Sequence, residues 1–249
     1  MINFFRALRK DSSADKNIGM YLAYALGEIV LVVIGILIAL QVDNWNKENE
    51  NREKERKYLS EIRTNLQEDL RNIDMVFSYN KGKTACINNV LNDFGKMKNT
   101  PQMVVRFSSS MDTLSSFEVF NTNKIAFQNL MSSASIDLIQ NDSLRTLLPR
   151  YYNEVSLSVQ SGTQQRVAQS SRKFVDEVGP HLMNRDMLQR FFNVEIPIKS
   201  ITEVNLANNE LVVHDLFFME RMIVSQNAEI KQYREDVMQL IAIINAELE

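Results

Sequence analysis

One carboxylate lies inside the most apolar stretch of the chain, where an ionisable side chain is costly. Glu28 is the one ionisable residue in the run from Met20 to Val42, which reads MYLAYALGEIVLVVIGILIALQV. A carboxyl group in such a place faces protein or water and finds a partner there, or extends to the nearby interface. We predict that Glu28 contacts a neighbouring helix, protonated or hydrogen-bonded. Extension toward the cytoplasmic interface is the competing interpretation.

Small residues accompany this carboxylate along the run. Four of them recur at spacings of four and eight: Ala23, Gly27, Gly35 and Ala39. Gly35 and Ala39 form a small-xxx-small pair, the pattern that lets two membrane helices approach closely. The sequence therefore predicts a helix-association surface made of Gly27, Glu28, Gly35 and Ala39.

No other residues form a recognisable catalytic or metal-binding pattern. His181 and His214 are far apart in the sequence and lack the spacing of metal ligands. The single cysteine, Cys86, excludes an internal disulfide framework. Glycine-rich nucleotide loops and the hydrolase and zinc-protease signatures are absent. We expect no enzyme activity, no catalytic residues, no cofactor and no bound metal.

The run around Glu28 has the length and the flanks of a transmembrane helix, predicted at residues 20–44. From Tyr24 to Trp45 an α-helix would extend about 32 Å, close to the roughly 30 Å thickness of bilayer hydrocarbon. Tyr21, Tyr24 and Trp45 lie where aromatic side chains anchor a helix in the membrane interface. Because no small-residue cleavage pattern ends the run, we expect a retained anchor rather than a cleaved signal peptide.

Charges beside the run favour an N-terminus in the cytoplasm. Residues 1–19 carry four basic and two acidic residues, whereas residues 43–57 carry five of each. Lys and Arg alone, the residues that the positive-inside rule counts, are almost balanced at four against five. The net charge, +2 before the run against 0 after it, favours an N-terminus in the cytoplasm. We predict a bacterial inner-membrane protein with residues 1–19 as a short cytoplasmic amphipathic segment and the C-terminal domain in the periplasm.

The residues after the run have helical periodicity. Apolar residues follow one another at steps of three and four: Leu59, Ile62, Leu66, Leu70, Ile73 and Phe77. We predict a stalk and first bundle helix at 45–80, a turn at Gly82, and a second helix over Thr84–Phe94. Residues 81–205 are expected to form a helical domain with irregular segments near 95–122 and 191–205. The first segment would include a short extended stretch at Met103–Phe107.

A heptad pattern marks the C-terminal residues 206–249. Its heptad seam is Ile223, Gln226, Ile230, Tyr233, Val237, Leu240 and Ile244. Such a pattern predicts one long coiled-coil-like helix. Antiparallel packing against residues 55–80 of the same chain is the expected arrangement, and joining two chains is the alternative. The fold class is therefore all-α: a transmembrane helix, a helical stalk and an antiparallel bundle.

Two stretches resemble a known family. The run GEIVLVVIGILIALQVDNWN at 27–46 resembles the N-terminal signature of a family of uncharacterised single-pass membrane proteins of Bacteroidetes-type bacteria. The start FFRALR is similar, as is IQNDSLR at 139–145 followed by Tyr151-Tyr152-Asn153. The Gly-Glu-Ile motif recurs in that family, which implies a role for Glu28 and Gly35 beyond anchoring. The resemblance implies no activity.

Composition narrows the remaining function classes. The net charge is −3 and no basic stripe is present, so we expect no nucleic-acid partner. The expected partners are the lipid bilayer and either further copies of the chain or other membrane proteins. We predict a structural or assembly subunit of a larger membrane complex. The alternative is a ligand-binding periplasmic sensor that signals through a partner protein.

Overall fold

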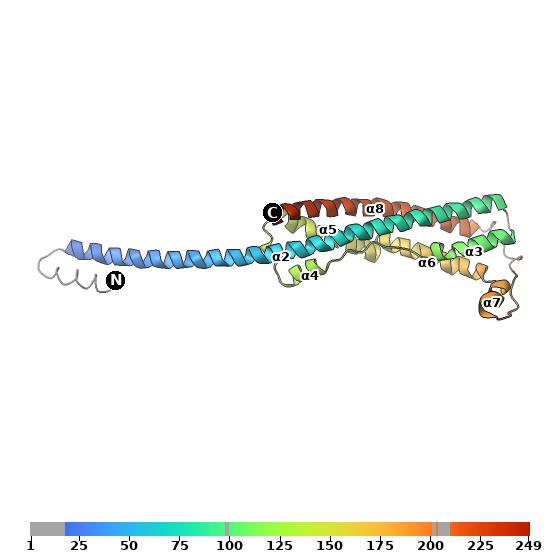
Figure 1. The fold of residues 1–249 in the computed structure, drawn as a ribbon, viewed down its shortest axis with the longest axis horizontal. Helices are drawn as coiled ribbons and strands as arrows, with labels where there is room; N and C mark the ends of the chain where they lie inside the picture. The colour runs from blue at the N-terminus through green and yellow to red at the C-terminus, as the bar shows by residue number, and fades with distance from the viewer. Residues whose placement is uncertain (1–17, 98–99, 201–202, 204–209) are drawn as a thin grey trace. The chain divides into compact units, whose positions relative to one another are not determined.

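The computed structural model describes residues 18–97, 100–200, 203 and 210–249. Its elements are α2 (Ile18–Met97), α3 (Pro101–Ser115), α4 (Ile125–Ser132), the 3-10 turn η1 (Ile136–Leu138), α5 (Asp142–Ser161), α6 (Thr163–Leu182), α7 (Arg185–Phe192) and α8 (Glu210–Leu248) (Figure 1). These ranges contain no strand, which confirms the all-α prediction. The predicted amphipathic segment lies almost wholly outside the described residues.

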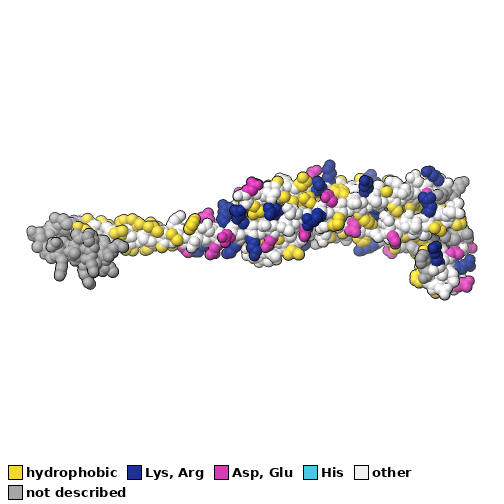
Figure 2. Space-filling model, viewed as in Figure 1, with side chains coloured by type: hydrophobic (Ala, Val, Ile, Leu, Met, Phe, Trp, Pro, Cys, Tyr) yellow, Lys and Arg dark blue, Asp and Glu magenta, His cyan; other side chains and the backbone are white. Residues whose placement is uncertain are grey.

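The chain divides into two compact units, Met1–Lys54 and Glu55–Glu249, and α2 contributes to both. In the first unit, α2 carries the one stretch of described residues that is long and apolar enough to cross a membrane. Its side chains are exposed all round the helix. Figure 2 shows one side of this apolar surface. The second unit is the helical bundle.

The bundle has four columns that alternate in direction (Figure 1). The first column is α2 from Glu55 onward, and the fourth is α8. The second column is α3, a non-helical segment at 116–124, and then α4. The third is α5 followed directly by α6, with Gly162 between them. Two columns are therefore unbroken helices, and two are interrupted near their middle.

α2 and α8 pack antiparallel along matched heptad seams, which confirms the predicted intramolecular pairing. The Arg63 guanidinium donates to Asn245 Oδ1 at 3.2 Å, and Thr84 Oγ1 donates to Glu220 Oε2 at 3.0 Å, so the register holds along the pair. The buried seam of α2 is Leu59, Ile62, Leu66, Asp69, Ile73, Val76, Asn80, Lys83, Ile87, Val90 and Phe94. The buried seam of α8 is Val212, Leu216, Met219, Ile223, Gln226, Ile230, Tyr233, Val237, Leu240 and Ile244.

The turn predicted at Gly82 is wrong, because α2 continues through this residue to Met97. The heptad seam runs on through Lys83 and Ile87, and burial of this face stabilises the helix more than one glycine weakens it. The helix predicted separately over Thr84–Phe94 is thus the last part of α2.

The extended stretch predicted at Met103–Phe107 is also wrong, because it lies within α3. The Thr100 side chain caps this helix by accepting from the Met103 amide at 3.2 Å. Pro101 occupies the first helical position, where its missing N–H is harmless. Among the described residues of the irregular segment predicted near 95–122, the non-helical ones are Thr100 and those from 116 onward, and they continue to 124, where α4 has not begun.

The ends of the other helices follow from their side chains. Asn141 caps α5, and its side chain accepts from the Leu144 amide at 3.1 Å. Pro149 lies inside α5, and α6 continues past Gly179 and Pro180 to Leu182. Residues 193–200 are non-helical, as predicted for 191–205, and most of 201–209 lies outside the described residues.

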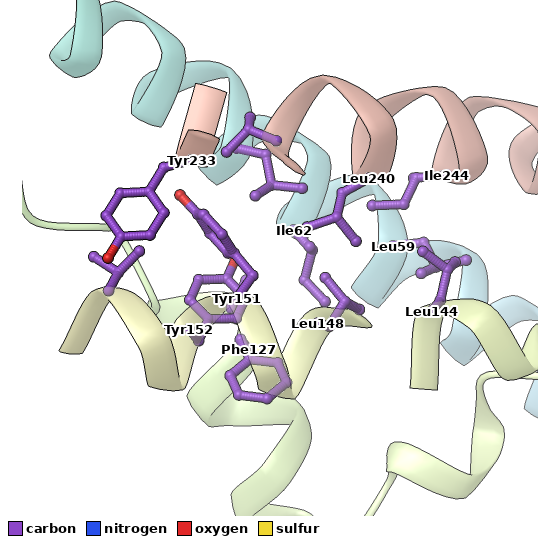
Figure 3. Close-up of a cluster of buried hydrophobic side chains, with 14 of the residues drawn as sticks. Leu59, Ile62, Phe127, Leu144, Leu148, Tyr151, Tyr152, Tyr233, Leu240 and Ile244 are labelled. Carbon is purple, nitrogen blue, oxygen red and sulfur yellow. The ribbon is translucent and has the colours of Figure 1, made fainter. Parts of the chain in front are cut away.

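Buried apolar side chains form two separate clusters within the bundle. The first core joins α2, α4, α5 and α8 around Ile62, Tyr151 and Leu240. Figure 3 shows part of it, with Phe127 stacked on Tyr152 at a ring-centroid distance of 4.5 Å. The second core joins α2, α3, α6 and α8 around Phe107 and Phe174.

Two Gly→Ala substitutions should have opposite effects, one inside the continuous α2 at Gly82 and one at the junction of α5 and α6 at Gly162. Gly82→Ala should raise the free energy of unfolding by about 0.5–1 kcal/mol, because a Cβ there meets no atom within 4 Å and alanine favours the helix. Gly162→Ala should lower it, because the added Cβ would lie 2.6 Å from Ser158 Cα. Urea unfolding of the full chain in detergent, followed by circular dichroism at 222 nm, measures both. Destabilisation by Gly82→Ala would contradict the continuous helix.

Candidate functional site

The predicted association residues lie on one uninterrupted helix, and helical geometry separates them into a face and a margin. At about 100° per residue, Gly35 and Ala39 each lie within about 20° of Glu28 around the axis of α2. Gly27 lies about 100° from Glu28, and Ala23 about 140° from it. We call Glu28, Gly35 and Ala39 the carboxylate face.

Nothing within the described chain occupies this face. A Cβ added at Gly27 or Gly35 would meet no atom within 4 Å, so intramolecular packing does not require glycine at either position. The interfacial aromatic residues are exposed as well: Tyr21 by 66%, Tyr24 by 59% and Trp45 by 62%. The helix thus presents Glu28 beside two small residues on a surface that is open to lipid or to another chain.

The bundle contains a second set of polar residues that sequence periodicity did not single out, beginning with Asp69. This side chain is fully buried in the α2 seam. Its carboxylate accepts from the Asn123 amide at 2.9 Å, the Tyr151 hydroxyl at 2.8 Å and the Thr122 hydroxyl. Burial raises the pKa of Asp69, and these three donors oppose that rise. Asp69 therefore attaches the 116–124 segment and α5 to α2.

A larger group of buried polar residues crosses the middle of the bundle. Gln226 of α8 donates to Gln164 Oε1 of α6 at 2.7 Å and to the Glu118 carbonyl at 2.9 Å, and it accepts from Asn80 of α2 at 2.8 Å. Gln164 Oε1 also accepts from the Phe120 amide at 3.0 Å. One amide pair thus connects all four columns.

Lys83 completes this group. Its ammonium donates to Ser171 Oγ of α6 at 2.8 Å and to the Ser116 carbonyl, and the residue is only 2% exposed. Burial lowers the pKa of Lys83 to about 8, because few polar atoms replace the water that a charged ammonium requires. We define the polar layer as the buried residues Asn80, Lys83, Ser158, Gln164, Ser171 and Gln226.

The bundle also holds an ion-paired carboxylate between α6 and α8. The Lys173 ammonium lies 3.1 Å from Asp215 Oδ1 and 3.4 Å from Glu177 Oε1, and His214 Nδ1 lies 3.2 Å from the same Asp215 oxygen. The pKa of Asp215 is lowered: its hydrogen bonds and Lys173 favour the charged form and outweigh burial. Across the described residues, no group of three His, Cys, Asp or Glu has the geometry of a metal site.

A small pocket lies within the bundle. A pocket between α5 and α8 is lined by Leu147, Tyr151, Asp236 and Leu240 among others, and its volume is about 10 Å³. That volume is enough for about one water molecule. The buried polar groups of the layer bond to one another, so they serve the packing of the helices in this state.

The sequence pattern included Gln226 in the seam of α8, but along α2 it followed apolar residues only and so missed the polar members of that seam. The steps of three and four that lead through Leu59 and Leu66 continue through Asp69, Asn80 and Lys83 without a change of phase. A heptad pattern that tolerates polar members would have found these positions. It would also have shown that Leu70 and Phe77, which are half-buried, flank the seam.

These features define a helical-bundle protein with one helix that is long and apolar enough to cross a membrane. The chain belongs to a family of unknown function (DUF6090), whose model matches residues 28–208, which is 181 of 249 residues. The match includes most of the apolar run, from Glu28 onward, and all of the bundle except α8. No curated protein and no solved structure matches the chain.

The buried ammonium predicts a specific pH dependence of stability. The pKa of Lys83 rises from about 8 in the folded chain to its ordinary 10.5 on unfolding, so folding is penalised most below pH 8. The penalty falls as the pH rises from 8 to 10.5, by about 2–3 kcal/mol. Lys83→Met should remove this rise in the free energy of unfolding. Urea unfolding at several pH values measures it.

The control is Lys81→Met, which removes the same charge from an exposed position on the same helix. This variant should keep the wild-type pH dependence. If Lys83→Met and Lys81→Met gave the same pH profile, the burial of Lys83 would carry no energetic weight.

Proposed function

We propose that this chain is a single-pass inner-membrane protein that acts as a structural or assembly subunit of a larger complex. It associates with further copies or with other membrane proteins through α2, centred on Glu28, Gly35 and Ala39 with Gly27 at the margin. The helical bundle is presented on the periplasmic side. The observation that carries the proposal is the shared face of a carboxylate and two small residues.

The energetics of a membrane favour a protein neighbour for this face. Glu28 lies roughly 12 Å along the helix from Met20, at a depth where a lone carboxyl group is costly. A neighbouring helix supplies hydrogen-bond partners for that group. Gly35 and Ala39 allow the neighbour's backbone to come close, so that van der Waals packing adds to the hydrogen bond.

The contacts inside the bundle support an assembly role. Its central polar groups bond to each other across four columns, so in this state they hold the helices together. A sensor that signals through a partner is the alternative proposal, and these observations lend it no specific support. The bundle's charged outer surface suits contacts with other proteins.

The periplasmic location rests on the charges that flank the apolar run. The net charge is +2 before the run and 0 after it, which supports retention of the N-terminal side in the cytoplasm. Lys and Arg alone, four against five, favour neither side. The C-terminal end of α8 returns to the start of the bundle, where Arg56 donates to the Leu248 carbonyl. A reporter fused there would lie on the same side of the membrane as the bundle.

The association proposal predicts that bulky or apolar substitutions on the carboxylate face dissociate the complex. Gly35→Leu should separate the helices sterically, and Glu28→Leu should remove the hydrogen-bonding group. Each should weaken association by roughly tenfold or more, given coupling energies of about 1–2 kcal/mol for such contacts. Native mass determination in detergent measures the change against the 28.8 kDa mass of one chain.

Ala23→Leu is the matched control, because it adds the same bulk about 140° away from Glu28 on the same helix. It should leave the assembled mass unchanged. A wild-type chain that is a monomer and binds no other protein, unaltered by Gly35→Leu and Glu28→Leu, would reject the proposal.

The proposed orientation predicts the activity of two reporter fusions at the C-terminus. Alkaline phosphatase, which matures in the periplasm, should be active there, and green fluorescent protein exported by the same route should be dark. The opposite result would place the bundle in the cytoplasm. In that case the charge argument would be wrong, while the association proposal would still stand.

A further inference from the structure

We propose that the polar layer is a hinge plane within the bundle: the half that contains the second core opens as a unit while the half that contains the first core stays folded. This inference is independent of the membrane helix. It rests on three features that coincide at one level of the bundle: the boundary between the two apolar cores, the buried polar side chains, and the interruptions in two of the four columns.

The two apolar cores end on opposite sides of the polar layer. Along α2, Val76 belongs to the first core and Ile87 to the second, and Asn80 and Lys83 lie between them. Along α8, Gln226 separates Ile230 of the first core from Ile223 of the second. Each core is thus a separate apolar cluster, and on α2 and α8 the buried residues between the two cores are polar. On α6, the apolar Val167 is buried beside Gln164 and Ser171 and belongs to neither core.

Separation at this level exposes little apolar surface beyond that of the second core. The groups exposed at the boundary can exchange their bonds within the layer for bonds to water, so each loses only the modest net energy of a buried hydrogen bond. Lys83 gains by opening, because its ammonium recovers hydration that the closed bundle denies it. The layer is therefore the level at which the bundle divides most easily.

The backbone is interrupted at the same level. The second column is non-helical at 116–124, and the third breaks at Gly162 between α5 and α6. The two unbroken columns have helix ends in the second half, at Met97 of α2 and Glu210 of α8. Opening therefore unwinds α2 and α8 from these ends and changes the backbone angles at 116–124 and Gly162. No helix has to start unwinding in its interior.

Hydrogen exchange of the full chain in detergent, read by mass spectrometry, tests this division. Amides of α3 and α6 should exchange through a shared opening that costs less free energy than the opening of α5 and of residues 230–244. The deciding variant is Val155→Ala, in the first core. If the second half opens while the first core is intact, this substitution leaves that opening unchanged.

Val155→Ala should speed exchange of α5 and 230–244 by roughly tenfold and that of α3 and α6 by less than about twofold. Val178→Ala is the matched substitution in the second core and should speed exchange in both halves, because it destabilises the closed state relative to both openings. Leu148→Ala, fully buried in the first core, repeats the test with a larger deletion. Equal acceleration of both halves by Val155→Ala and Leu148→Ala would show one cooperative unit and overturn the proposal.

Discussion

The register of α2 against α8 depends on polar side chains that lie inside an apolar seam. A seam of leucine and isoleucine alone could slip by one heptad at small cost, because each layer would meet an equivalent layer. Asn80 and Gln226 can bond only when they are opposite each other, and a slip would break this buried hydrogen bond. Since Gln226 also holds Gln164 and the Glu118 carbonyl, the same constraint positions α6 and the 116–124 segment.

The sequence of α2 changes character along its length. From Met20 to Val42 its residues are apolar around the whole circumference except for Glu28, which makes this part apolar enough to cross a membrane. Those after Glu55 are apolar on one stripe, because the opposite side faces water. Between the two lies a charged segment, 47–57, with no apolar stripe in its first part. Glu28 is the one acidic or basic residue in the apolar part, and the proposed association face is therefore centred on it.

Much of the architecture was predictable because helix periodicity survives in a single sequence. The C-terminal seam from Ile223 to Ile244 was predicted residue by residue. Its antiparallel packing against α2 was predicted as an arrangement, but Leu70 and Phe77 flank the α2 seam instead of lying in it. The turn predicted at Gly82 is wrong. One glycine destabilises a helix by about 1 kcal/mol, and burial of Ile87, Val90 and Phe94 beyond it stabilises the helix by more than that. The carboxylate face could be proposed from spacing alone, since Glu28, Gly35 and Ala39 lie on one helix and need no tertiary contact to be aligned.

The sequence by itself determined the apolar run, the helical class and the C-terminal heptad seam, because these follow from local composition and from a period of 3.5 to 3.6 residues. Only the tertiary structure decided which partners the polar residues of the seam bond to. The bonds from Asp69 to Asn123 and Tyr151, and from Lys83 to Ser171, join residues that are 54, 82 and 88 positions apart. No local pattern encodes such pairs, because a buried polar group is satisfied by whichever donor or acceptor the packing brings to it.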